Sequence, residues 1–230
     1  MKTIKFLPII FALMIGFSAI AQEDKTDEMK TLFKKSSTDK ISSGGYGSFS
    51  IGYSNIDSKD ALQLGGRVAW IANHRIALGL AGFGFVNSIQ KNYNADYDPS
   101  NYFIAGGYGG IFVEPIIMPN SPVHVSFPIL FGAGGASAVE ADNWDNSSYN
   151  NHNTQYYDSD AFLVFEPGID IEFNIVKFFR IAINTSYRFT NGINLRYKYL
   201  DNNYAEQEIV INKNALDSFT FNVGFKFGWF

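Results

Sequence analysis

The sequence predicts an all-β protein, a membrane-inserted, eight-stranded, antiparallel up-and-down β-barrel. Three observations lead to this fold class. From residue 44 onward, apolar and polar residues alternate with the period of two that is typical of a β-strand. Eight such segments follow one another, and the connections between them are alternately short and long. The last segment, 218–230, is aromatic at almost every second position.

The composition fits a protein with little water-exposed surface. Charged residues make up only 17% of the 230 residues, below the quarter or so that is usual, and aromatic residues also make up 17%. The chain has no cysteine, which excludes disulfide bonds and thiolate metal sites. The net charge of −4 gives no reason to expect a nucleic acid as a partner.

The N-terminal residues predict export. Residues 1–21 have a basic start, an apolar run and the small-x-small motif Ala19-Ile-Ala21, so we predict a cleaved signal peptide. The alternative is an uncleaved membrane anchor, but the apolar run is short for a spanning helix, which needs about 20 residues. Residues 22–43 are charged and predict a periplasmic lead-in, either a short helix or disorder. The barrel is expected over residues 44–230.

Eight segments alternate strongly enough to be predicted as strands. They cover roughly residues 44–56, 60–72, 75–87, 101–114, 122–138, 160–175, 178–190 and 215–229. Each is long enough to cross a bilayer when tilted, which takes about 9–11 residues. Because lipid offers no hydrogen-bond partner to the backbone, strands can span it only as a closed barrel. The fourth segment is rich in glycine, and its parity is ambiguous.

The connections predict that the two ends of the barrel differ. The long ones, at 87–101, 139–160 and 190–214, are polar and rich in Asn, Asp and Tyr. The short ones lie at 72–74, 114–121 and 175–177, with a modest link at 55–59. With an even number of strands, all the long connections fall at one end of the barrel and both termini fall at the other.

The two faces of the strands favour lipid over water outside the barrel. A soluble, lipocalin-like barrel would be apolar inside and polar outside. Here the polar face is mostly Gly, Ala, Ser and Asn with few charges, which suits the narrow interior of an eight-stranded barrel. Trp70 and Trp229 fall at the short-turn end, and Tyr102 and Tyr187 fall toward the other end, as in two aromatic girdles that flank a lipid-facing band. The alternative interpretation is that the tryptophans belong to a core.

These features together resemble a known family. A signal peptide, eight amphipathic strands, alternating turn lengths and a terminal aromatic strand are similar to the small eight-stranded outer-membrane barrels of Gram-negative bacteria, the OmpA/OmpX type. The resemblance covers roughly residues 44–230 and rests on pattern. It implies a barrel in the outer membrane, with loops outside the cell, termini in the periplasm and outer-membrane lipid as a partner.

The resemblance also implies a role for the last strand. In that family a terminal Phe and the alternating apolar residues before it are a signal for the barrel-assembly machinery, and Phe219 to Trp229 with Phe230 look like this signal. Phe230 departs from the pattern because it directly follows Trp229 and has the opposite parity. Either Trp229 is the effective anchor, or Phe230 turns outward where the strand geometry relaxes.

The sixth and seventh segments carry charged residues on the inward face: Glu166, Asp170, Glu172, Arg180 and Arg188. The short turn between the segments sets Glu166 opposite Arg188 or Ser186. In the same two registers Glu172 lies opposite Arg180 or Ala182. Either register therefore pairs one acid directly with a base, which is favourable across strands.

Arg67 and Lys226 are further candidates on the inward face. Because an unpaired charge in a narrow lumen is costly, we predict that all these residues form an internal salt-bridge network. Its expected role is structural filling, since eight strands leave no open pore.

Two prolines within strands predict an interruption of the sheet. Pro128 and Pro167 belong to neighbouring antiparallel segments, and neither can donate a hydrogen bond to the ladder. A closed barrel has no free edge where a missing donor is harmless. We therefore expect a bulge or a break where the two prolines come near one another.

Catalytic motifs are weak. The three histidines are His74 in a short turn, His124 near the short-turn end facing inward, and His152 in a long connection. His124 shares a face with Ser126, but a Ser/His site also needs an orienting acid at a place that lipid can enter. We therefore predict no enzymatic activity and no cofactor.

The long connections supply the remaining candidates. Their acids match no calcium-loop spacing, so no metal site is predicted; they are Asp96, Asp98, Asp142, Asp145, Asp158 and Asp160. Trp144, Tyr149, Tyr156 and Tyr157 lie among Ser and Asn, a composition typical of adaptable recognition surfaces. We predict a structural or surface-interaction protein that binds an extracellular ligand or protein through these loops. The alternatives are a narrow transport or signalling barrel, a lipid-modifying enzyme and a soluble binding barrel.

Overall fold

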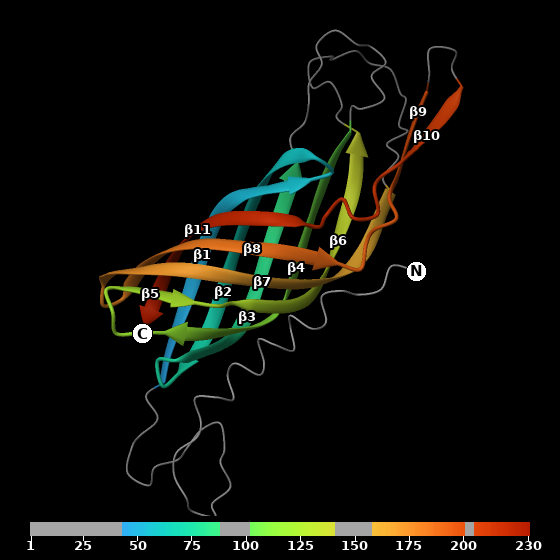
Figure 1. Cartoon of the computed structure of the whole chain (residues 1–230). Helices are drawn as coiled ribbons and strands as arrows, with labels where there is room; N and C mark the ends of the chain where they lie inside the picture. Colours follow the sequence, from blue (N-terminus) through green and yellow to red (C-terminus); the bar gives the residue numbers. More distant parts are fainter. Residues whose placement is uncertain (1–42, 88–101, 141–157, 201–204) are drawn as a thin grey trace, which may run out of the picture. The chain divides into compact units, whose positions relative to one another are not determined.

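The structure is a computed structural model that describes residues 43–87, 102–140, 158–200 and 205–230 (Figure 1). The predicted signal peptide and all but the last residue of the lead-in lie outside this part. So do the loop candidates Trp144, Tyr149, Tyr156 and Tyr157, together with His152, Asp96, Asp98, Asp142 and Asp145. The described part of the chain contains no helix with the length and hydrophobicity of a membrane span.

The described residues form β-strands joined by turns and irregular segments. The strands are β1 (Ser43–Ile56), β2 (Lys59–Ala72), β3 (Ile76–Asn87), β4 (Tyr102–Ile117), β5 (Val123–Ser126), β6 (Ile129–Glu140), β7 (Asp158–Val176), β8 (Phe179–Thr190), β9 (Arg196–Leu200), β10 (Glu206–Val210) and β11 (Ser218–Trp229). Nine of them form one sheet in the order β3-β2-β1-β11-β8-β7-β5-β4-β6. The further pairings β3–β4 and β7–β6 close this sheet into a ring.

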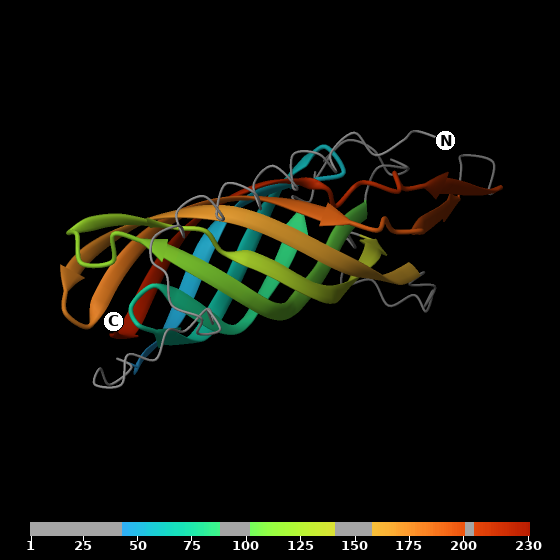
Figure 2. The same cartoon turned by 60° about the horizontal axis from the view of Figure 1, so that its bottom comes forward.

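The ring has eight positions, because β5 and β6 share the position between β4 and β7. All the pairs are antiparallel, and Figures 1 and 2 show the strands tilted around a common axis. This confirms the all-β, eight-stranded, antiparallel barrel that the sequence predicts.

Paired residues give the stagger of the barrel when they are followed once round the ring. The path starts at Arg180 on β8, passes through Lys226, Ser48, Arg67, Ala81, Gly110, Gly132 and Val164, and returns to β8 at Thr190. The stagger is therefore the ten residues from Arg180 to Thr190. For eight strands, this stagger corresponds to a strand tilt of roughly 40° and an interior that side chains fill.

The two faces of the sheet have opposite polarity. On β2, the side chain of Leu64 is 43% exposed on the outer wall, while its neighbour Gln63 is fully buried inside. The same alternation runs along β11, where Phe219 and Phe221 face outward and Thr220 is buried. An apolar outer wall around a polar interior is the reverse of a soluble barrel, and it is the arrangement that lipid requires.

The connections differ between the two ends of the barrel, as the sequence predicts. The links β2–β3, β4–β5 and β7–β8 span only 73–75, 118–122 and 177–178, and we call their side the short-turn end. The links β3–β4, β6–β7 and β8–β11 lie at the other, long-connection end. The tight β1–β2 turn at Asp57–Ser58 lies there too. Its two residues have positive φ angles of 52° and 60°, as a two-residue hairpin loop requires.

Tyr102 corrects the predicted aromatic girdle. Its side chain is 8% exposed and points into the barrel, where its hydroxyl donates a hydrogen bond to Asp57 Oδ2 at 2.6 Å. The sequence left this parity open because the glycines of β4 carry no side chain to mark a face. Tyr187 lies on the outer face, where its ring meets that of Phe219 edge-on at 4.8 Å.

The prolines break the ladder without inserting a residue. β4 pairs with β5 up to Ile116↔Ser126 and with β6 from Val113↔Ile129, and both sets keep one register across Phe127 and Pro128. The β7–β8 ladder is likewise interrupted beside Pro167, between Phe165↔Phe189 and Gly168↔Ser186. Gly168 N donates to Pro128 O at 2.8 Å and joins the strands across the gap. The structure therefore has a break at the prolines, whereas a register shift occurs between Asn174 and Val176.

The third long connection contains two strands that are not among the eight predicted segments. β9 and β10 pair with each other, from Glu206↔Leu200 to Val210↔Arg196. Beside this hairpin, apolar residues of the connection pack against β1 and β4 at the long-connection end. They form one buried cluster that includes Ile56, Ile104, Ile193, Leu195 and Leu216. Two aspartates join the connection to β7. The carboxylate of Asp160 accepts a hydrogen bond from Asn194 N at 2.7 Å, and that of Asp158 accepts one from Arg196 N at 2.6 Å. The long-connection end of the lumen is thereby covered by an apolar layer.

A charge on the outer wall tests whether this wall faces lipid. We expect Leu64→Lys, near the middle of β2, to lower the free energy of unfolding by about 2–4 kcal/mol, because lipid does not solvate the ammonium group. The matched Leu64→Met change should cost less than about 1.5 kcal/mol. Urea titration in lipid vesicles, followed by the heat-dependent mobility of the barrel on SDS gels, measures both. Equal stability of the two variants would contradict a lipid-facing wall.

Candidate functional site

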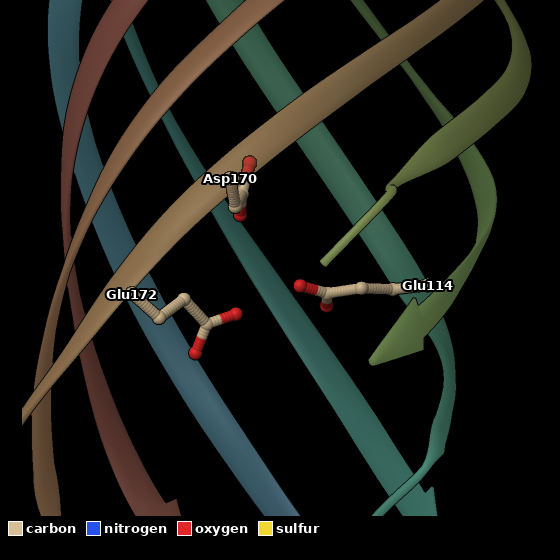
Figure 3. A group of neighbouring side chains, drawn as sticks. All are labelled: Glu114, Asp170 and Glu172. Atoms are coloured by element: carbon tan, nitrogen blue, oxygen red, sulfur yellow. The ribbon is translucent and has the colours of Figure 1, made fainter. Parts of the chain in front are cut away.

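The most concentrated chemistry of the described chain is a charged cluster inside the barrel, centred on Lys226 of β11. Its ammonium nitrogen lies 2.7 Å from Glu114 Oε1, 3.0 Å from Asp170 Oδ2 and 2.8 Å from Glu172 Oε1. Figure 3 shows the three carboxylates pointing toward one another, Glu114 from β4 and the two others from β7. All four side chains are buried.

Two arginines complete the charge balance of this cluster. Arg67 Nη1 lies 2.8 Å from Asp170 Oδ2, and Arg180 Nη1 lies 3.5 Å from Glu172 Oε2. With Lys226, three cationic side chains therefore face three carboxylates. A buried ionic cluster is tolerated when its charges are paired and its remaining lone pairs accept hydrogen bonds.

Neutral donors satisfy those remaining lone pairs. Ser126 Oγ lies 2.5 Å from Glu114 Oε1 and 2.8 Å from Glu172 Oε1, so the two carboxylates share its single hydroxyl proton. Asn184 Nδ2 donates to Asp170 Oδ1 at 2.5 Å, and the Tyr46 hydroxyl donates to Glu114 Oε2. Every carboxylate of the cluster thus contacts at least one cation and one neutral donor.

Two of the ion pairs cross the lumen. In the ring, β11 and β4 are four positions apart, and so are β2 and β7. The pairs Lys226–Glu114 and Arg67–Asp170 therefore join opposite walls of the barrel. A solute that entered the lumen at this level would have to separate both pairs.

The three carboxylates resemble a metal site only in part. Their oxygens lie within 4.8 Å of one another, and oxygen ligands of this kind suit hard divalent cations. However, the ammonium group of Lys226 lies within 3.0 Å of an oxygen of each carboxylate and supplies the positive charge that a metal ion would bring. Together with Arg67 and Arg180, this ammonium group already neutralises the donor set.

Glu166 and Arg188 form a second polar group, closer to the long-connection end. Glu166 Oε1 accepts hydrogen bonds from Ser186 Oγ at 2.6 Å and Thr220 Oγ1 at 3.4 Å. Arg188 Nε donates to Leu216 O at 2.8 Å, and its Nη2 donates to two serine hydroxyls. Its guanidinium also lies over the ring of Tyr108 at 5.3 Å.

Two registers were predicted for β7 and β8, and the structure has one of them. In this register Glu172 lies opposite Ala182, and Glu166 lies level with Arg188. Glu166 and Arg188 lie where the β7–β8 ladder is interrupted beside Pro167. The acid–base contact between these strands is the diagonal one, between Glu172 and Arg180. Glu166 Oε2 and Arg188 Nη1 have no hydrogen-bond partner among the described residues.

Five members of the cluster are absent from the network that the sequence predicts, namely Glu114, Tyr46, Asn184, His124 and Ser126. Glu114 is the acid that bridges the lumen, but it follows the glycine-rich part of β4, where the parity was ambiguous. Tyr46 lies on the first strand, far from its partner in sequence. Its inward parity, opposite to that of Phe49 and Ile51, is the signal that could have indicated it.

His124 and Ser126 do not form a nucleophilic pair. His124 Nε2 lies 3.2 Å from Glu172 Oε2, while Ser126 donates to the other oxygen of that carboxylate. A catalytic serine needs a histidine that accepts its proton. Here the hydroxyl donates to carboxylates, and both side chains are buried inside the barrel. Both side chains instead contact the carboxylate of Glu172 in the charged cluster.

The C-terminal dipeptide divides between the two faces. Trp229 is 82% exposed on the outer wall. The ring of Phe230 turns inward, stacks on Tyr46 with centroids 6.1 Å apart, and has the guanidinium of Arg180 3.7 Å from its centroid. An outward Phe230, one of the two expectations from the sequence, is therefore wrong. The terminal ring instead covers the charged cluster at the short-turn end.

Side chains fill the interior between these two ends. Two internal cavities, one beside Glu166 and one beside Asn222, have volumes of only about 10 Å³ each. A cavity of this size holds about one water molecule. The described lumen thus offers polar groups and isolated water-sized spaces.

Comparisons with known proteins address the fold. No protein-family model matches the sequence, and no curated protein matches it. Among solved structures, the chain is similar to a major outer membrane protein from Thermus thermophilus, with a TM-score of 0.53, 9% identity, and 81% of this chain and 99% of that chain covered. For Neisserial surface protein A the TM-score is 0.46 and the identity 9%, with 82% of this chain and 99% of that chain covered. For the attachment invasion locus protein Ail of Yersinia pestis the TM-score is 0.42 and the identity 11%, with 81% and 97% covered.

At these identities the likeness concerns the fold alone. The closed ring, the apolar outer wall and the likeness to the Thermus thermophilus protein together define the fold. The protein is a small, closed, eight-stranded antiparallel β-barrel with an apolar outer wall and a polar interior.

Removing the central cation tests the charge cluster. We expect Lys226→Met to lower the free energy of unfolding by about 3–5 kcal/mol, because three buried carboxylates would then face two arginines. Adding Glu114→Gln restores an equal number of charges and should recover part of the loss. Urea titration of the single and double variants measures the coupling between the two residues. Additive losses would contradict the neutralisation of Glu114 by Lys226.

Proposed function

We propose that the protein is a non-enzymatic outer-membrane barrel with a structural or surface-interaction role, performed by what its long connections present outside the cell. The observation that carries the proposal is the contrast between a filled, charge-balanced lumen and an end where all the long connections gather. Connections on a rigid scaffold are the segments that most often carry function. Trp144, Tyr149, Tyr156 and Tyr157 are the proposed recognition residues.

The proposal includes an orientation. The long-connection end faces outside, and the short-turn end with the C-terminus faces the periplasm, as is typical of outer-membrane barrels. The barrel-assembly machinery is the proposed partner during insertion. Trp229 is its effective anchor, because Trp229 continues the outward aromatic face of Phe219, Phe221 and Phe227, whereas Phe230 faces inward.

The absence of native cysteine allows a clean test of this orientation. Single cysteines at Ser147, in the second long connection, and at Lys177, in the β7–β8 turn, are compared with a membrane-impermeant maleimide on intact cells. We expect Ser147→Cys to react on intact cells, and Lys177→Cys to react only after the outer membrane is permeabilised. The reverse pattern would mean that the barrel is inserted the other way round.

Conductance separates the surface role from the alternative of a narrow transport barrel. We expect the purified protein in planar bilayers to show no discrete channel currents, because two ion pairs cross its lumen and both ends are covered. A known outer-membrane porin added to the same bilayer provides the positive control. Regular single-channel steps from the wild-type barrel would favour transport over the proposed role.

A further inference from the structure

A shallow groove runs along the outer wall at the short-turn end. Its volume is about 460 Å³, and it crosses β11, β1 and β2 toward β3. Its principal lining residues are Gly45, Gly47, Val68, Trp70, Phe227 and Trp229. The surrounding wall is convex and apolar, so a depression here is a local feature.

The groove exists because two outward positions of β1, Gly45 and Gly47, carry no side chain and lie between large side chains of β11 and β2. Gly47 is paired with Phe227 on one side and Val68 on the other, and a Cβ added to it would meet nothing within 4 Å. One step toward the end of the barrel, Gly45 is paired with Trp229 and Trp70. The floor is therefore glycine backbone, and the sides are large apolar rings and chains.

The two tryptophans fix the level of the groove in the membrane. Indole rings collect at the membrane–water interface, where the ring contacts acyl chains and the N–H group meets lipid headgroups. The indole of Trp229 stands clear of the protein and is 82% exposed, so it forms a free-standing side of the groove. From the indole level, the groove leads toward the membrane interior past Gly47.

We propose that this groove is a binding site for one acyl chain of a phospholipid of the inner leaflet, lying along β1 between the two tryptophans. The groove is continuous with the lipid-facing wall, and its lining offers no charged side chain, so its occupant is apolar. The glycine floor belongs to one strand, with large side chains of β11 and β2 on its two sides, so the depression accepts a single chain. The leaflet rests on the proposed orientation of the barrel.

The physical basis of binding is packing. Lipid tails surround the entire wall, so burying apolar surface gives this site no advantage over its neighbours. A chain between Trp70 and Trp229 contacts protein on three sides instead of one and gains dispersion contacts. The indole N–H groups add hydrogen bonds to the ester or phosphate oxygens of the same molecule.

Filling the floor tests the site with a matched control. Gly47→Leu places a side chain where the acyl chain lies, and the open space above Gly47 lets the variant fold. Gly82→Leu is the control. Gly82 is also an outward glycine, with its nearest neighbouring atom 4.0 Å from an added Cβ, but it does not line the groove.

Native mass spectrometry of the full chain in mild detergent, titrated with dipalmitoyl phosphatidylethanolamine, measures binding. We expect the wild type and Gly82→Leu to bind one phospholipid with equal affinity, and Gly47→Leu to bind it at least five-fold more weakly. Heat-dependent mobility on SDS gels verifies that each variant is folded. Equal binding by all three folded proteins, no binding by the wild type, or a dimer that excludes the lipid would each overturn the proposal.

The same titration with lipopolysaccharide separates this inference from the orientation on which it rests. A groove that selects lipopolysaccharide, together with reversed labelling of Lys177→Cys, would contradict the orientation. Phosphatidylethanolamine binding that is unaffected by Gly47→Leu would contradict the groove site alone.

Discussion

The interior of the barrel depends on one buried ammonium group that contacts three buried carboxylates. Lys226 reaches Glu114 on the opposite wall, and Asp170 and Glu172 on β7 converge on the same nitrogen. Two further cations then balance the acids. Because each buried charge is compensated by others on different strands, the cluster is stable only as a whole. It links β2, β4, β7, β8 and β11 across the lumen, and most of these links lie between strands that are not neighbours in the ring.

The surroundings of the cluster follow from this constraint. Water that entered the lumen would screen the ion pairs, and the structure covers both ends with apolar groups. At one end, Ile56, Ile104, Leu195 and Leu216 form a buried layer. At the other, the ring of Phe230 lies on Arg180. The outer wall is apolar because it meets lipid. Since successive residues of a strand face opposite sides, each strand places polar residues in the lumen and apolar residues on the wall.

The pattern of the sequence was sufficient for the strands, their faces and the difference between the ends. Each depends on local alternation or on the length of a connection, and both can be read directly from the chain. The partners across the lumen could not be predicted in the same way. Which residues meet there depends on the ten-residue stagger, which is a property of the closed ring, and Lys226 and Glu114 are far apart in sequence. The glycines of β4 concealed its parity, so Glu114 was missed and Tyr102 was assigned to the wrong face.

The end of β11 shows how one dipeptide resolves two demands. In a strand, two consecutive residues must face opposite sides, so a chain that ends Trp-Phe cannot place both rings in lipid. An inward phenylalanine ring would lie in a polar lumen, so it needs a neighbour there that packs favourably against it. Arg180 does so, because its guanidinium lies 3.7 Å from the ring centroid and Tyr46 packs beside it. The departure of Phe230 from the alternating pattern therefore places its ring over Arg180 and Tyr46, while Trp229 continues the aromatic face that meets the membrane.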